Sequence, residues 1–234
     1  MTLRAALFDV GDTLVEHWVP REQMRVAVRE AVTAAFGERE WFDRLYDADL
    51  EPRDPTGPLR QETNRWYADW FAANGVPLDG VEVDRLRAAF AVPLDRVASL
   101  ADGADEAVRW CKRRGLRVVL VTNTLSRGDA EVVEDWRRFG LGDAIDAVVS
   151  SHSVGWRKPH PAIFERALRL AGAQPGEAFH VGDSLRADVQ GAQQLGIRAV
   201  WRRTRAPDEA ESRILPDATI DRLSELPGAV ASWR

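Results

Sequence analysis

The segment Ala5-Ala-Leu-Phe8-Asp9-Val-Gly11-Asp12-Thr13-Leu14 begins as a short apolar run and ends in a polar turn. The pattern recurs along the chain, where apolar runs of strand length lead into polar or glycine-rich turns and then into segments with helical spacing. Such alternation is typical of parallel strands joined by crossover helices. The later runs lie at residues 118–121, 147–149, 178–181, 198–201 and 218–220. The sequence therefore predicts an α/β protein built on a parallel sheet.

A long insertion separates the first two predicted strands. The residues that end them, Asp9 and Thr122, are 113 positions apart, whereas a crossover with its helix needs only about 30 residues. The extra sequence contains four helical segments, which we place at residues 22–36, 41–50, 59–73 and 83–90. We predict a core of residues 1–15 and 100–234 and a helical cap domain of residues 16–99. A cap that leaves from the carboxyl end of a strand can close over the ligand crevice of a parallel sheet.

Local signals place the start of three helices within the core. Asp102 is a candidate N-cap for a helix over residues 102–114, with Gly115 as its C-terminal stop. Ser126-Arg-Gly-Asp129 resembles a capping box. Pro161 occupies the first-turn position that helices favour for proline.

The composition excludes several classes of protein. With 32 basic and 37 acidic residues the net charge is −5, and no run of five like charges suggests nucleic-acid binding. A single cysteine, Cys111, cannot form an intrachain disulfide, and the apolar runs are too short to span a membrane. The chain passes into its first strand without a signal-peptide pattern. We expect a cytoplasmic protein with neither nucleic acid nor membrane as a partner.

Polar residues gather at the ends of the predicted strands. The groups are Asp9 with Asp12 and Thr13, Thr122 with Asn123, Lys158 before Pro159, and Asp183 with Ser184 and Asp188. Each group alone is weak, because an aspartate after a strand is usually a turn or cap residue. Together, at the carboxyl ends of parallel strands, they describe a site. Its carboxylates suit a hard divalent cation, its hydroxyl and backbone amides suit an anion, and its ammonium neutralises added charge.

Four segments resemble, in order, the four motifs of the haloacid dehalogenase-like superfamily. They are residues 7–14, 119–123, 155–161 and 181–188. The resemblance implies a hydrolase with a Rossmann-like parallel sheet and a mostly helical cap that shapes the substrate pocket. It favours a phosphatase that acts on a small phosphorylated metabolite.

The resemblance also implies roles for single residues in phosphoryl transfer. Asp9 would be the nucleophile that becomes an aspartyl-phosphate, which water then hydrolyses. Thr122 and the backbone amides that follow, at Asn123, would bind phosphate oxygens. Lys158 would offset the negative charge gathered between the nucleophile and the phosphate.

By the same resemblance the cofactor is Mg²⁺. Its ligands would be Asp9, Asp183 and the backbone carbonyl of Gly11. Asp188 would bind the ion directly or through water, or would hold Lys158.

One position departs from the pattern of the family phosphatases. The second residue after their nucleophile is usually an aspartate that protonates the leaving oxygen and later activates water, and here that residue is Gly11. An aspartate follows one position later, at Asp12, where its side chain points elsewhere unless the turn compensates. Because a general acid contributes about 10²–10⁴-fold, its loss matters little for a good leaving group and greatly for an alkoxide.

Three readings follow from this departure. The chain could be a phosphatase that acts on aryl or acyl phosphates, or that recruits Asp12, Glu16, His17 or a cap residue as proton donor. It could be a 2-haloacid dehalogenase, which also lacks the acid but needs no metal and typically replaces the aspartate that stands here as Asp183. It could be a weakened relative that uses the site for binding or regulation, although retention of Asp9, Lys158 and Asp183 speaks against that.

The use of lysine supports the assignment of the third motif. The 32 basic residues comprise 30 arginines and only two lysines, Lys112 and Lys158. A compact ammonium and a planar guanidinium are not interchangeable in a tight site. We therefore predict that Lys158 cannot be replaced by arginine and that Lys112, on the polar side of its helix, can.

Overall fold

A parallel sheet of six strands lies at the centre of the structure, a computed structural model that describes residues 2–48, 59–124 and 126–233. The strand order is β5-β4-β1-β6-β7-β8, and every neighbouring pair is parallel. The strands are β1 (Ala5–Phe8), β4 (Arg117–Thr122), β5 (Ala147–Ser150), β6 (Ala178–Gly182), β7 (Arg198–Arg202) and β8 (Ala218–Ile220). The predicted α/β architecture with a Rossmann-like parallel sheet is confirmed.

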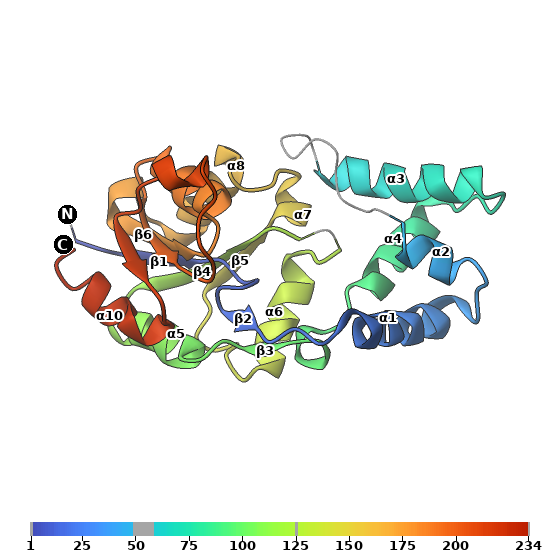
Figure 1. The fold of residues 1–234 in the computed structure, drawn as a ribbon, viewed down its shortest axis with the longest axis horizontal. Helices are drawn as coiled ribbons and strands as arrows, with labels where there is room; N and C mark the ends of the chain where they lie inside the picture. Colours follow the sequence, from blue (N-terminus) through green and yellow to red (C-terminus); the bar gives the residue numbers. More distant parts are fainter. Residues whose placement is uncertain (1, 49–58, 125, 234) are drawn as a thin grey trace.

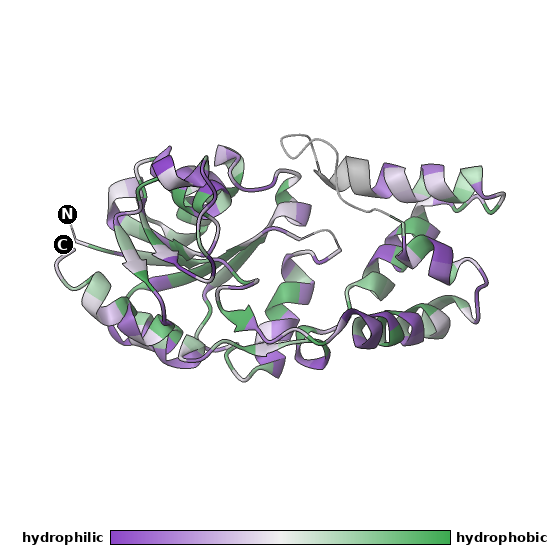
Figure 2. Ribbon diagram, viewed as in Figure 1, coloured by the Kyte–Doolittle hydropathy of each residue, from purple (hydrophilic) through white to green (hydrophobic). Residues whose placement is uncertain are grey.

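Helices cover both faces of this sheet. Because successive residues of a strand point to opposite faces, Ala6 and Phe8 join one apolar cluster and Ala5 and Leu7 join the other. The covering helices include α5 (Ala104–Arg113), α6 (Asp129–Arg138) and α8 (Pro161–Ala171). Figure 2 shows apolar residues concentrated on the strands and hydrophilic residues on the outer helix faces. With both faces covered, the ends of the strands are left to carry a site.

Four helices interrupt the chain between β1 and β4. They are α1 (Arg21–Phe36), α2 (Phe42–Tyr46), α3 (Leu59–Ala73) and α4 (Gly80–Phe90). Two short strands, β2 (Val15–Glu16) and β3 (Ser99–Leu100), pair antiparallel where the chain leaves and re-enters the sheet region. In Figure 1 the four helices form a group at the end of the molecule opposite the two termini. The predicted helix at residues 41–50 is shorter than expected, and its predicted end at Leu50 lies outside the described residues.

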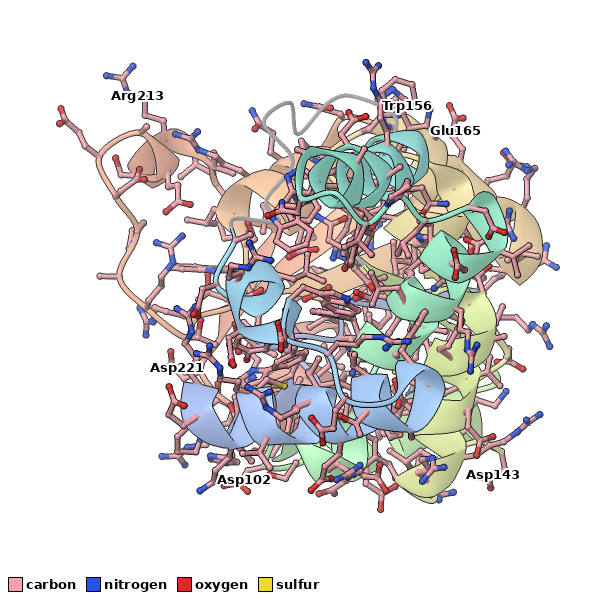
Figure 3. The ribbon with its side chains drawn as sticks, turned by 90° about the vertical axis from the view of Figure 1, so that its right-hand side faces the viewer. Asp102, Asp143, Trp156, Glu165, Arg213 and Asp221 are labelled. Carbon is pink, nitrogen blue, oxygen red and sulfur yellow. The ribbon has the colours of Figure 1, made fainter. Side chains whose placement is uncertain are left out.

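The inserted helices pack around an aromatic centre. Tyr67 and Phe71 of α3 are buried together with Phe42 of α2 and Leu86 of α4. Figure 3, which views the molecule from the side of these helices, shows charged side chains projecting outward around them. Among the described helices, none combines the length and apolarity that crossing a membrane requires.

The start of α5 differs from the prediction. Gly103, not Asp102, is the N-cap, and it has a left-handed backbone with φ of 80°. A Cβ at Gly103 would lie 3.2 Å from the backbone nitrogen of Ser224. The close approach of a distant segment therefore fixes the helix start.

The predicted capping box of α6 is also wrong. The N-cap is Gly128, whose backbone N–H donates to Glu131 Oε2 at 3.0 Å. Asp129 instead accepts hydrogen bonds from the backbone N–H and the hydroxyl of Ser150, at 2.7 and 2.8 Å. Its carboxylate thus ties α6 to the end of β5. For α8, the predicted Pro161 start is confirmed.

Candidate active site

A buried ammonium between two carboxylates forms the centre of the candidate site. Lys158 Nζ lies 2.5 Å from Asp9 Oδ1 and 2.6 Å from Asp188 Oδ1. Asp9 directly follows β1, Asp188 lies in the π-helical turn η3 (Leu185–Gln190) after β6, and Lys158 precedes α8. All three residues are buried. The fold thus brings together side chains that are up to 179 positions apart in the sequence.

Asp188 is held by a set of donors that the sequence did not indicate. Its Oδ1 also contacts His180 Nε2 at 2.9 Å, and its Oδ2 accepts from the backbone N–H of Ser184 at 3.1 Å. Gly182 makes room for it, because a Cβ there would lie 2.3 Å from Asp188 Cγ. His180 points into the core from β6, so only the fold reveals its partner.

The charges in this cluster stabilise one another. Burial alone would raise the pKa of Asp188, but the Lys158 ammonium and the hydrogen bond from His180 outweigh burial and lower that pKa to about 2. Burial alone would lower the pKa of Lys158, but the Asp188 and Asp9 carboxylates raise it. Lys158 and Asp188 are therefore an ion pair at neutral pH.

Asn123 positions Lys158 through its backbone. The Asn123 Oδ1 accepts from the backbone N–H of Lys158 at 2.8 Å, and its Nδ2 donates to the carbonyl of the same residue at 3.2 Å. The Asn123 side chain is therefore occupied, which leaves the backbone amides after Thr122 as the groups suited to a phosphate. Thr122 itself is buried at the end of β4.

Asp183 completes a cluster of three carboxylates. One oxygen from each of Asp9, Asp183 and Asp188 can be chosen so that all lie within 4.8 Å of one another. Burial raises the pKa of Asp183 to about 7, and the charges of Asp9, Asp188 and Asp12 add to the effect. Burial likewise raises the pKa of Asp9, despite the opposing charge of Lys158. An oxygen-rich site whose carboxylates resist ionisation is one that a hard cation would stabilise.

The turn after β1 is fixed by Arg202, a residue that the sequence did not single out. Arg202 Nη1 donates to the carbonyls of Asp12 and Thr13 at 2.7 and 3.0 Å. The Thr13 hydroxyl donates to Asp9 Oδ2 at 3.2 Å. Asp12 has a left-handed backbone with φ of 54°, and its carboxylate accepts a hydrogen bond from Trp18 at the surface. The structure thus places Thr13 at the cluster and turns the Asp12 side chain toward Trp18.

A cavity of about 390 Å³ adjoins the cluster. Gly11, Thr122 and Asn123 line it on the side of the strand ends, and Trp18 and Leu94 line it where the inserted segment begins and ends. Its position at the carboxyl ends of parallel strands is where such sheets bind ligands. Thr122 and Asn123, predicted from the sequence to bind phosphate, therefore face a space that can hold a small molecule.

Comparison with known proteins identifies similar chains. A model of the haloacid dehalogenase-like hydrolase family matches residues 3–196. The "Haloacid dehalogenase-like hydrolase domain-containing protein 3" of Mus musculus is 30% identical over 215 residues, covering 85% of this chain and 81% of its own. The "Glyceraldehyde 3-phosphate phosphatase" of Pyrococcus furiosus is 28% identical over 213 residues, covering 85% of this chain and 80% of its own.

A solved structure extends the similarity to the whole chain. The 2-haloacid dehalogenase from Pseudomonas syringae pv. Tomato DC3000 superposes with a TM-score of 0.64 at 26% identity, covering 100% of both chains. Similarity thus reaches proteins named for two different reactions.

Proposed function

This chain belongs to the haloacid dehalogenase-like hydrolases, and from that premise we propose that it is a Mg²⁺-dependent phosphatase that forms an aspartyl-phosphate on Asp9. The observation that carries the proposal is the buried cluster in which Lys158 bridges Asp9 and Asp188 while Asp183 stands beside them. The similarity to a glyceraldehyde 3-phosphate phosphatase supports a small phosphorylated metabolite as substrate.

Each residue of the cluster has a part in the proposed reaction. An Asp9 carboxylate oxygen attacks the phosphorus atom, and the bond from phosphorus to the ester oxygen breaks. The Lys158 ammonium, held between Asp9 and Asp188, offsets the charge of the phosphate that approaches it. Thr122 and the amide at Asn123 orient the phosphate oxygens. Water then attacks phosphorus, which releases inorganic phosphate and restores the Asp9 carboxylate.

The carboxylate cluster fits a magnesium ion. We propose Asp9, Asp183 and the Gly11 carbonyl as ligands, since oxygen donors are those that Mg²⁺ prefers. Both Asp188 oxygens already accept hydrogen bonds from the protein, so we assign Asp188 to holding Lys158 and to contact with the ion through water. When bound, the ion would neutralise phosphate charge and polarise the phosphorus centre.

The acid chemistry of the proposed reaction is atypical. Gly11 stands where a family phosphatase usually has its second aspartate, and it has no side chain with which to protonate the leaving group. The proposal therefore makes nucleophilic attack and charge stabilisation, not proton donation, the main sources of rate.

We further propose that residues 16–99 form a cap domain over a core of residues 1–15 and 100–234. Two contacts support this division of labour. Arg87 of α4 donates to the carbonyl of Ser126 and lies 3.7 Å from Glu131, and Trp18 and Leu94 line the cavity from the two ends of the insertion. The insertion is thereby placed to control which molecules reach Asp9.

A second candidate is a 2-haloacid dehalogenase, in which Asp9 would displace halide from carbon. Two observations favour it: the missing acid at Gly11 and the similarity to the Pseudomonas syringae dehalogenase. The carboxylate cluster with Asp183 favours the phosphatase, because halide displacement needs no metal.

The decisive assay measures phosphate release from 4-nitrophenyl phosphate and chloride release from 2-chloropropionate, each with Mg²⁺ and with a chelator. We expect phosphate release that requires Mg²⁺ and falls at least about 10³-fold in Asp9→Asn. Chloride release that persists in the chelator would establish the dehalogenase instead. Undiminished phosphate release by Asp9→Asn would refute the nucleophile assignment.

A further inference from the structure

Trp18 covers the position of the missing acid. A Cβ built on Gly11 would lie 3.9 Å from Trp18 Cζ2, which is ordinary contact distance. Trp18 Nε1 donates to Asp12 Oδ1 at 2.9 Å. An indole ring held by Asp12 thus stands beside Gly11, where the acid of other family phosphatases would project.

The alternative proton donors that the sequence suggested are engaged elsewhere. Glu16 Oε2 accepts from Arg202 Nη2 at 2.5 Å, and its other oxygen lies 3.3 Å from His17 Nε2. The His17 side chain is 63% exposed. Asp12 faces Trp18, as described above. In the structure these three residues bind to one another's neighbours and not to a group at Asp9.

The cavity beside Asp9 offers no acid of its own. Among the described residues that line it there is no carboxyl, imidazole, phenol or ammonium group. Its walls combine apolar side chains, from Val10, Trp18, Leu94 and Val132, with hydroxyl, amide and guanidinium groups. A leaving group in this space meets an aromatic and aliphatic surface and no group suited to protonate it.

We propose that the substrates are phosphate esters of acidic hydroxyl groups, of which aryl phosphates are the simplest, and that Trp18 is the wall against which the planar leaving group packs. This inference rests on the proposed phosphatase function. In the reaction the bond from phosphorus to the aryl oxygen breaks with its electron pair on that oxygen. The aryl oxide departs as an anion and takes its proton from water. An alkoxide is too basic to leave in this way.

The test compares kcat/KM for three monoesters whose leaving groups are progressively less acidic: 4-nitrophenyl, phenyl and glycerol phosphate. This parameter includes only the steps through cleavage of the ester bond when that cleavage is irreversible. We expect a decrease of more than about 10⁴-fold across the series, beyond what a general acid would compensate. Equal values for the three esters would overturn the inference and leave the phosphatase proposal intact, whereas no phosphate release from any of them would overturn both.

Two variants test the missing acid. Gly11→Asp should raise kcat/KM for glycerol phosphate by at least about tenfold without a gain for 4-nitrophenyl phosphate. Asp12→Asn keeps an oxygen that can accept from Trp18 and removes the acid, so the leaving-group dependence should stay as steep as in the wild type. A loss in Asp12→Asn confined to glycerol phosphate would identify Asp12 as the proton donor and overturn the inference.

Variants of Trp18 test the aromatic wall. Trp18→Ala should raise KM for phenyl phosphate by up to about tenfold and leave KM for glycerol phosphate unchanged, and Trp18→Phe should restore most of the difference. Equal effects on both esters would show that Trp18 is not the surface that selects the leaving group.

Discussion

The Lys158 ammonium fills the gap between two carboxylate oxygens, at 2.5 and 2.6 Å, and its side chain is 2% exposed. A planar guanidinium in that gap would have to displace Asp9 or Asp188. Because a misplacement of about 1 Å can cost 10²-fold, we expect Lys158→Arg to reduce kcat for aryl phosphate by about that factor or more. The steady-state rate at saturating Mg²⁺ measures this.

Lys112 supplies the matched control for the lysine substitution. Its ammonium pairs with both oxygens of Asp146, at 2.7 and 2.8 Å, on the outside of the sheet. An arginine can make the same two-pronged contact, so Lys112→Arg should leave the rate unchanged. Equal losses at both positions would mean that the scarcity of lysine says nothing about the site.

The raised pKa of Asp183 predicts the pH dependence of metal binding. With a pKa of about 7 in the metal-free protein, Asp183 is protonated below that pH, and Mg²⁺ must displace the proton. The apparent affinity should fall about tenfold per pH unit below pH 7 and level off above it. Calorimetric titration across about pH 5 to pH 8 measures this, and an affinity that is constant below pH 7 would rule out Asp183 as a ligand that titrates there.

At the scale of elements, the strands were predictable from the sequence because buried parallel strands are short, continuous apolar runs. The ends of α5 and α6 were not. Gly103 adopts its conformation against the Ser224 backbone, and Asp129 gives its carboxylate to Ser150 in place of its own helix. Both outcomes depend on segments that are distant in the sequence.

The candidate site divides in the same way. Asp9, Lys158, Asp183 and Asp188 were predicted, because each follows a strand or belongs to a family motif, and the fold brings them together. The partners that hold them were missed. His180 resembles any buried strand residue, and Arg202 is one arginine among 30, so the sequence carries no signal that separates them from their neighbours.

A buried ion pair joins α6 to the segment that returns from the insertion. Asp135 of α6 accepts from the backbone N–H of Leu94 at 2.9 Å and lies 3.2 Å from Arg127 Nε. Removing one partner of a buried pair leaves an uncompensated charge, which costs about 3–5 kcal/mol. We therefore expect Asp135→Ala to lower the free energy of unfolding by about that amount in a denaturant titration.

The control for this substitution is Asp221, which Figure 3 shows at the margin of the molecule and which pairs with Arg203 in solvent. Asp221→Ala should change the denaturant midpoint little. Similar losses in the two variants would show that the pair at Asp135 has no special part in docking the insertion.

At the scale of the whole molecule, the carboxylate cluster lowers stability in exchange for function. A carboxyl whose pKa is raised on folding destabilises the folded state once the pH exceeds its unfolded value, and the full penalty of Asp183 is present at pH 8. Mg²⁺ should therefore raise the melting temperature of the protein, by about 2.7 kcal/mol of added stability when its concentration is 100 times Kd.

Asp183→Asn separates the two effects. Without Mg²⁺ the variant should melt at a higher temperature than the wild type, because a neutral amide replaces the strained carboxylate. Addition of Mg²⁺ should then change its melting temperature little. A variant that is less stable than the wild type and still responds to Mg²⁺ would contradict the assignment of Asp183 to the metal.

The claim on which all these scales depend is that Asp9 carries the phosphoryl group. The measurement that tests it most directly is acid quenching of the protein during turnover of radiolabelled aryl phosphate, followed by peptide mapping. The account predicts one alkali-labile acyl-phosphate label on the peptide that contains Asp9, absent from Asp9→Asn. A label on any other residue, or substrate turnover with no label on the protein, would contradict it.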